Sequence, residues 1–72
     1  MNVKDAVAKR IQNLCAENNI SLNELAVQSG LTPSTVYSIM DSKRRDISII
    51  TIKRICDGLS IELDVFFSDD FI

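Results

Sequence analysis

Apolar residues recur every three or four positions along most of the chain, and this spacing predicts helices that each bury one face. The first apolar stripe predicts a helix over residues 3–18, with Asn2 as its N-terminal cap. Lys4, Lys9 and Arg10 are predicted to lie off this stripe. The stripe itself consists of Val3, Val7, Ile11, Leu14 and Cys15.

Two shorter helices, separated by a glycine, are predicted next. Ser21 begins the capping-box pattern S-x-x-E, which satisfies two backbone N–H groups at the start of a helix. That helix is expected to end at Gly30, because glycine adopts the positive φ of a tight turn. Thr32 then caps a helix that holds Pro33 in its first turn. These elements predict a helix-turn-helix at about residues 21–41, and DNA-binding proteins lay the second helix of such a pair in the major groove.

Two further helices are predicted beyond a polar, charged loop at residues 41–46. Ser48 is placed to cap the first, which carries apolar residues at helical spacing. Ser60 is placed to cap the second, a short helix that turns Phe66 and Phe67 into the core together with Ile61. The apolar residues of the longer helix are Ile52, Ile55, Cys56 and Leu59.

The whole pattern predicts an all-α fold, a compact bundle of five short helices without strands, repeats or linkers. The 72 residues, of which 46% are hydrophobic, suffice for a single domain over residues 1–72 with a short acidic and apolar tail at 68–72. A chain of this length buries only about 60% of its unfolded surface, so we expect modest stability.

The sequence offers little that could support catalysis or metal binding. Cys15 and Cys56 lie 41 residues apart, in no metal-binding spacing, and the chain has no histidine. Both cysteines fall in apolar helical patterns and are predicted to be reduced core thiols, which fits a reducing cytoplasm. Without a nucleophile elbow or a phosphate-binding loop, we expect no enzyme, no cofactor and no metal. A chain this small also leaves no pocket for a small-molecule ligand.

The N-terminus lacks the apolar stretch of a signal peptide, and no apolar run approaches the ~18 residues of a membrane span. We therefore expect a cytoplasmic protein with no membrane partner.

The net charge of −2 is unusual for a protein that binds DNA, because neutralising phosphates drives affinity. The charge is unevenly distributed, however. Residues 1–56 hold all eight Lys and Arg with five acids, whereas residues 57–72 hold five acids and no base. This distribution suits a dipolar molecule with one face toward DNA, and it suits equally an ordinary soluble domain with an acidic tail.

The segments at residues 21–26, 30–36 and 48–67 combine correctly spaced core positions with helix caps, and residues 43–45 add a basic run. Through them the chain resembles the Cro/C1-type helix-turn-helix family of phage and bacterial repressors, often called the XRE family. The likeness covers roughly residues 5–68. It implies a lambda-repressor-like domain with the helix-turn-helix in its second and third helices, a double-stranded DNA partner, and a bacterial or phage origin. It also implies a homodimeric transcriptional repressor that binds an inverted repeat in promoter DNA.

Three features depart from the family pattern. Ser42 stands where the family often has glycine after the recognition helix, and Leu22 stands where many members have a polar residue that touches phosphate. Cys15 and Met40 align with an Arg and a Glu that many members pair. Because an apolar pair can replace a buried ion pair at little cost, the fold is still expected, whereas Leu22 lacks the polar group for a phosphate contact.

Helical geometry divides the predicted recognition helix into two faces, with Val36, Ile39 and Met40 inward. In the family, outward residues near the N-terminus of this helix meet base edges. Here they offer single hydrogen bonds and methyl contacts but no bidentate pair, so we expect weak direct readout in each half-site. On an isolated helix the same short polar residues would simply form a solvated face. The predicted base-reading residues are Pro33, Ser34, Thr35, Tyr37 and Ser38.

Phosphate contacts are predicted from side chains beside the recognition helix and from helix N-termini. Lys43, Arg44 and Arg45, here called the basic triplet, directly follow that helix, where the loop would flank the DNA backbone. The alternative for the basic triplet is a solvated loop. Asn23 and Thr32, near the starts of the second and third helices, complete the predicted set.

The last 16 residues are more apolar than a tail in water should be. We predict a dimer contact from Val65, Phe67, Phe71 and Ile72, on a face away from DNA; alternatively, these residues cover the small core or fray. A second interpretation of the whole chain is a protein-interaction module, or an antitoxin-like partner, built on the helix-turn-helix scaffold. The acidic balance and Leu22 favour that interpretation, and the basic triplet speaks against it.

Overall fold

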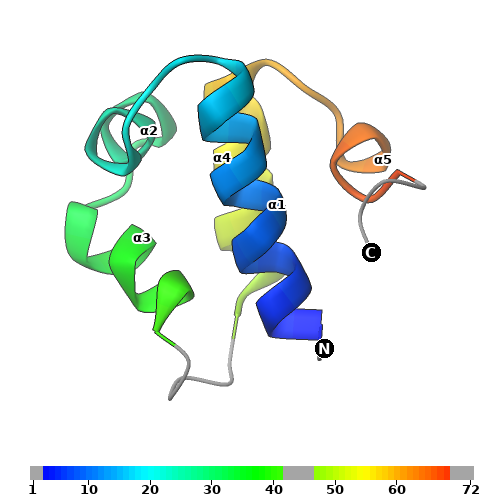
Figure 1. Cartoon of the computed structure of the whole chain (residues 1–72), viewed down its shortest axis with the longest axis horizontal. Helices are drawn as coiled ribbons and strands as arrows, with labels where there is room; N and C mark the ends of the chain where they lie inside the picture. Colours follow the sequence, from blue (N-terminus) through cyan, green and yellow to red (C-terminus); the bar gives the residue numbers. More distant parts are fainter. Residues whose placement is uncertain (1–2, 42–46, 69–72) are drawn as a thin grey trace.

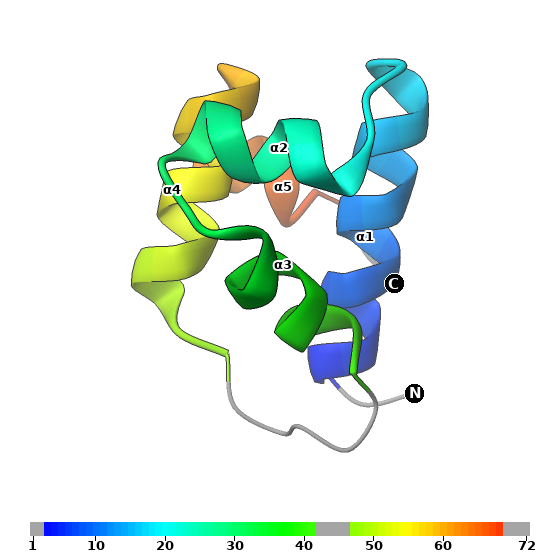
Figure 2. The ribbon, with the colours of Figure 1, turned by 90° about the vertical axis from the view of Figure 1, so that its left-hand side faces the viewer.

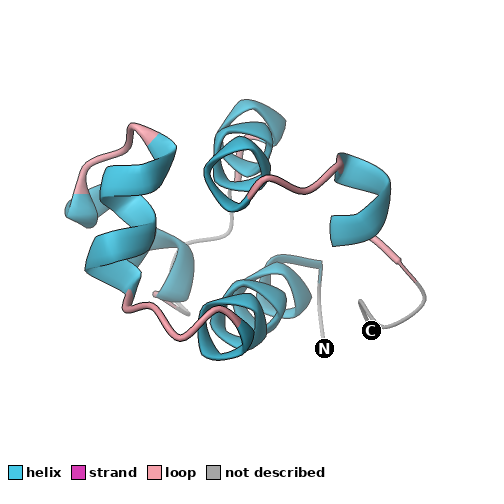
Figure 3. Ribbon diagram, turned by 90° about the horizontal axis from the view of Figure 1, so that it is seen from above, coloured by secondary structure: helices cyan, strands magenta, loops and turns pink. Residues whose placement is uncertain are grey.

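A computed structural model describes residues 3–41 and 47–68, which form five helices and no strand. The helices are α1 (Val3–Glu17), α2 (Leu22–Ser29), α3 (Pro33–Met40), α4 (Ile49–Leu59) and α5 (Leu63–Phe66). α1 and α4 stand between the α2–α3 pair on one side and α5 on the other (Figures 1 and 3). The predicted all-α fold is confirmed, and α1 ends one residue earlier than expected.

One cluster of buried apolar side chains joins all five helices. The stripe predicted for α1 supplies part of it, and the stripe of α4 faces α1 across the core. The cluster consists of Val7, Ile11, Leu14, Cys15, Leu25, Ala26, Val36, Ile39, Ile52, Ile55, Cys56 and Phe66.

The phase of the α1 stripe differs from the prediction at its first turn. Val3 is 68% exposed, whereas Lys4 is only 6% exposed. Lys4 precedes Val7 by three residues and Ile11 by seven, so helical geometry puts it on the same face as these core residues. The prediction that Lys4 lies off the stripe was therefore wrong. Lys9 is exposed and Arg10 is half-buried.

Local caps begin and end the helices largely as predicted. Ser21 and Glu24 form the complete capping box of α2, and Ser48 accepts a hydrogen bond from the backbone N–H of Ile50 at the start of α4. Ser60 is a correction, because it does not begin α5. With φ at 59° its N–H bonds back to the carbonyls of α4, so it ends that helix, and α5 starts after Glu62.

The two phenylalanines near the end of the chain have different environments. Phe66 is fully buried in the core, whereas Phe67 is 38% exposed, so the prediction that both turn inward holds only for Phe66. Successive residues of a helix point about 100° apart, so a single turn buries only one of them. The two rings pack edge to face with centroids 4.9 Å apart.

Both cysteines are buried and free, as predicted. Burial raises the pKa of the Cys15 thiol and of the Cys56 thiol, because desolvation disfavours the thiolate. Both side chains therefore act as small apolar core residues.

Candidate nucleic-acid interface

α2 and α3 form a tight helical pair that turns at Gly30. This glycine has φ of 69°, the left-handed conformation expected of it, and the next N–H, of Leu31, bonds to the carbonyl of Ala26 at 2.9 Å. Leu25 and Ala26 are fully buried beneath the turn. Figure 2 shows the two helices together on one face of the molecule, with α3 crossing below α2.

α3 is anchored by two side chains and exposes the opposite face. Val36 is fully buried and Ile39 is 5% exposed. Thr32 accepts a hydrogen bond from the Thr35 N–H, and Pro33 occupies the first turn, as the sequence predicts. The helix thus has a fixed start and a fixed inner face, which leaves its outer face to solvent.

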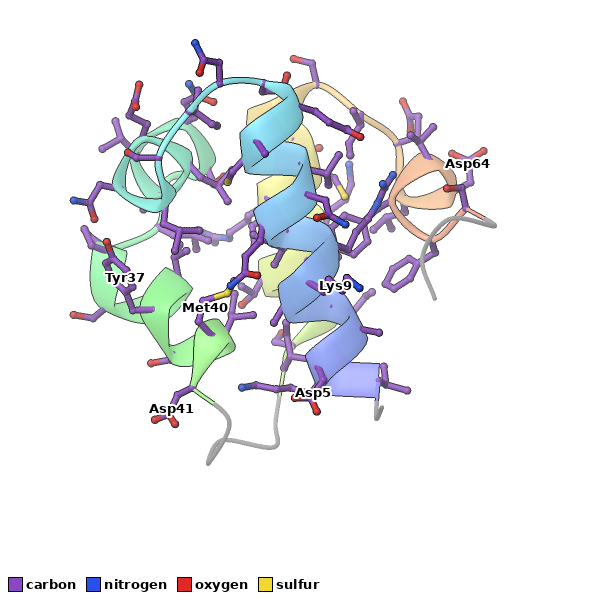
Figure 4. All side chains as sticks on the ribbon, viewed as in Figure 1. Asp5, Lys9, Tyr37, Met40, Asp41 and Asp64 are labelled. Atoms are coloured by element: carbon purple, nitrogen blue, oxygen red, sulfur yellow. The ribbon has the colours of Figure 1, made fainter. Side chains whose placement is uncertain are left out.

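The predicted base-reading residues divide into two groups by exposure. Pro33, Ser34 and Tyr37 are exposed, and Figure 4 shows Tyr37 on the side of α3 that points away from the bundle. Thr35 and Ser38 are half-buried at the edges of that surface. We call the exposed outer surface formed by Pro33, Ser34 and Tyr37 the α3 surface.

The hydroxyl groups at the edges of the α3 surface already have partners within the protein. The Ser38 hydroxyl donates to the Ser34 carbonyl at 2.8 Å, and the hydroxyl oxygens of Thr32 and Thr35 lie 2.9 Å apart. A hydroxyl has only one hydrogen to donate, so Ser38 in this conformation can offer a base only its lone pairs. The amino groups of adenine and cytosine are the donors that would suit it in the major groove.

The predicted phosphate contacts are partly described by the structure. Asn23 is exposed in the first turn of α2, and Thr32 is exposed at the start of α3, where its oxygen caps the helix. The basic triplet lies outside the described residues. The stretch at residues 21–41 contains two acids and no base, so any cationic side chain that attracts phosphate has to lie outside it.

A family model for the Cro/C1-type helix-turn-helix DNA-binding domain matches residues 10–67. The chain belongs to this family. Neither the curated proteins nor the solved structures give a match. At the level of the family, this Cro/C1-type protein is a DNA-binding transcription regulator, and the family is typically non-enzymatic.

The packing of this Cro/C1-type domain explains two of its departures from the family pattern. Cys15 is buried and Met40 is half-buried, and the Met40 sulfur accepts a hydrogen bond from the Gln12 amide at 3.3 Å. Cys15 belongs to the buried core and Met40 packs against it, so these two positions contribute apolar packing to the core. Leu22 is half-buried and packs against the core, and its side chain has no polar group that could contact a phosphate. Ser42 lies outside the described residues.

Sequence reasoning missed two basic residues that bind inside the protein. The Lys4 ammonium group donates to the backbone carbonyl of Asp41. Arg10 donates to the carbonyls of Phe66 at 3.1 Å and Val65 at 3.0 Å. For Lys4 a signal was present, because its spacing from the apolar residues of α1 places it on the inner face. For Arg10 the sequence held no signal, because its partners are backbone groups more than 50 residues away.

The other described basic side chains lie outside the α2–α3 pair. Lys53 forms an ion pair with Asp57 at 2.6 Å, and this hydrogen bond raises the pKa of Lys53. Lys9 and Arg54 are exposed on α1 and α4.

The predicted dimer residues are only partly described. Val65 is 46% exposed and Phe67 is 38% exposed, whereas Phe71 and Ile72 lie outside the described residues. α5 is separated from α3 by α1 and α4 (Figures 1 and 3). A contact through α5 would therefore leave the α3 surface uncovered.

Other kinds of site find no support in the described part of the chain. No group of three His, Cys, Asp or Glu side chains within residues 3–41 and 47–68 could hold a metal ion. None of the helices described combines the length and apolar character needed to cross a membrane.

Proposed function

We propose that this protein is a small transcriptional repressor of bacterial or phage origin that acts in the cytoplasm by occupying an inverted-repeat operator as a dimer. The single domain over residues 1–72 would present α3 to the major groove. The observation that carries the proposal is the α3 surface, which stays exposed on a helix fixed by a cap, a tight turn and two core side chains.

The α3 surface suits modest base readout. Ser34 offers one hydrogen bond, Pro33 fits a thymine methyl group, and Tyr37 offers a ring and a hydroxyl. Thr35 and Ser38 would add contacts from the edges. Each good bidentate contact discriminates by about 1–3 kcal/mol, and none of these side chains can form one with a base. Weak readout in one half-site is compensated when two half-sites are bound together.

Phosphate contacts would fix the register of α3 on the duplex. We assign them to Asn23, Thr32 and the basic triplet. The basic triplet would make most of these phosphate contacts, because the α2–α3 pair has no cation of its own.

The proposed dimer contact uses Val65 and Phe67, together with Phe71 and Ile72. The support for it is the exposure of two large apolar side chains, Val65 on α5 and Phe67 directly after it, on the side of the molecule away from α3. The alternative, a protein-interaction module on the same scaffold, would be favoured if the protein selects no DNA.

A binding selection from genomic fragments at ~150 mM salt, where non-specific phosphate binding is weak, tests the function. Wild type is compared with a variant in which Lys43, Arg44 and Arg45 are all changed to Ala. The matched control changes three other bases, Lys9, Lys53 and Arg54, to Ala and so removes the same charge elsewhere.

We expect wild type and the control to enrich one inverted-repeat motif and the basic-triplet variant to lose it. If no protein enriches any fragment, even at low salt, the DNA-binding proposal is wrong and a protein partner becomes the better explanation. If the control loses the motif as fully as the basic-triplet variant, net charge rather than the loop after α3 determines binding.

A further inference from the structure

Lys4 is a buried cation in α1 whose ammonium group reaches the end of the recognition helix. Lysine is almost never buried without a partner, yet this side chain is only 6% exposed. Its Nζ donates a hydrogen bond to the backbone carbonyl of Asp41, 37 residues away along the chain. Figure 4 shows the first turn of α1, marked by Asp5, at the same end of the molecule as Asp41.

The position of this contact on α3 gives it a specific role. Asp41 is the residue that follows the last turn of α3, and its own N–H still bonds back to Ser38. The last carbonyl groups of a helix lack partners within the helix, and the helix dipole favours a cation there. The last turn of α3 contains no basic residue, so Lys4 supplies from α1 the cation that α3 lacks.

The contact also controls how α3 is held. α3 is only eight residues long, and a helix of that length does not keep its position by itself. Thr32 fixes its start and two core side chains fix its inner face. Lys4 fixes its end against the first turn of α1. Lys4 and the hydrogen bond from the Gln12 amide to the Met40 sulfur at 3.3 Å together hold the end of α3 against α1, and Lys4 supplies the charged contact.

We propose that Lys4 is a positioning residue for DNA binding. Lys4 does not touch DNA, but it sets the angle at which the α3 surface meets base edges. The inference rests on the proposed function. A binding surface has to be held within about 0.5 Å of its productive geometry, so releasing one end of α3 is expected to weaken several contacts at once.

The test compares Lys4→Met with Lys9→Met. Methionine keeps most of the apolar stem and removes the ammonium group. Lys9 lies on the same helix and is exposed, so its variant makes the same chemical change away from α3. Affinity for the selected operator is measured over a series of salt concentrations, and the melting temperature and amide hydrogen exchange are measured without DNA.

For Lys4→Met we expect affinity to fall about tenfold at every salt concentration, because a displaced α3 surface weakens several base contacts together. The salt dependence should keep the wild-type slope. Amide exchange should accelerate at Ile39, Met40 and Asp41, while Lys9→Met leaves affinity and exchange unchanged. Lys4→Arg keeps a cationic donor and should recover most of the lost affinity.

Three results would overturn the inference. A salt slope lower by about 0.9 in Lys4→Met would show that Lys4 contacts a phosphate. A lower melting temperature with unchanged affinity of the folded protein would show a role in stability alone. Equal affinity of the two methionine variants would show no role in binding. If wild type itself binds no DNA, the proposed function fails first, which separates that failure from these three.

Discussion

At the residue scale, the contact between α2 and α4 depends on a glycine that has ordinary helical backbone. A Cβ built on Gly58 would lie 2.5 Å from the Ser29 hydroxyl oxygen and 3.0 Å from backbone atoms of Gln28. The Ser29 hydroxyl is buried and has no hydrogen-bond partner among the described residues. Close approach of the helices and an unsatisfied hydroxyl therefore occur at the same point, and the two residues should be energetically coupled.

Gly58→Ala is expected to lower the free energy of unfolding by up to about 2 kcal/mol, because overpacking costs about 1–3 kcal/mol and the better helix propensity of alanine offsets ~1 kcal/mol of it. Ser29→Ala should be neutral or stabilising, because it removes a buried group without a partner. In the Ser29→Ala background, Gly58→Ala should be less destabilising, although the Gln28 backbone remains in the way. Urea unfolding of the four proteins of this cycle measures the coupling, and equal effects of Gly58→Ala in both backgrounds would contradict it.

At the scale of the helices, two cations of α1 complete the ends of other helices. Lys4 binds the carbonyl that follows α3, and Arg10 binds the carbonyls of Val65 and Phe66 at the end of α5. α5 has only four residues, so it has little stability of its own and depends on such partners. α1 thus holds a helix on each side of the molecule.

Arg10→Met should lower the free energy of unfolding by about 1–2 kcal/mol, because two carbonyl groups lose a charged donor that is partly exposed. Amide exchange should accelerate in α5 while α2 and α3 keep their protection. Lys9→Met, an exposed cation one residue earlier, serves as the control and should leave stability within about 0.5 kcal/mol. If both variants lose stability equally, net charge and not the α5 carbonyls accounts for the effect.

Hydrogen bonds between residues close in the sequence could be predicted, whereas those between distant residues could not. The capping box at Ser21, the turn at Gly30 and the cap at Thr32 involve partners within five residues, so local pattern identifies them. The contacts of Lys4 and Arg10 cross 37 and 56 residues to backbone groups, which no local pattern encodes. The prediction for Ser60 is wrong because serine is a common N-cap residue, whereas the left-handed backbone of Ser60 follows from the way α4 ends.

For the candidate site, the sequence predicts the members of the α3 surface and not their hydrogen bonds. Helical geometry alone separates the buried Val36 and Ile39 from Pro33, Ser34 and Tyr37. That the Ser38 hydroxyl is already donating depends on its rotamer, which the sequence leaves open.

At the scale of the whole molecule, DNA binding and dimerisation would use opposite sides of the protein. The α3 surface lies on one side. The exposed Val65 lies on α5, and Phe67 directly after it, across α1 and α4 (Figure 3). Glu62 and Asp64 are exposed near these apolar residues.

Val65→Asp should weaken the proposed dimer, because it places a carboxylate in the apolar contact beside acidic neighbours. Val3→Asp is the matched control, since Val3 is 68% exposed on α1 and the change adds the same charge. Sedimentation velocity should show wild type and Val3→Asp as dimers at concentrations where Val65→Asp is a monomer. Affinity of Val65→Asp for an inverted repeat should fall by about tenfold or more, while affinity for a single half-site stays unchanged, because only the linked second binding event is lost. A monomeric wild type would contradict the proposed dimer. A dimer broken by Val3→Asp and kept by Val65→Asp would exclude α5 as the contact and point to the first turn of α1 around Val3.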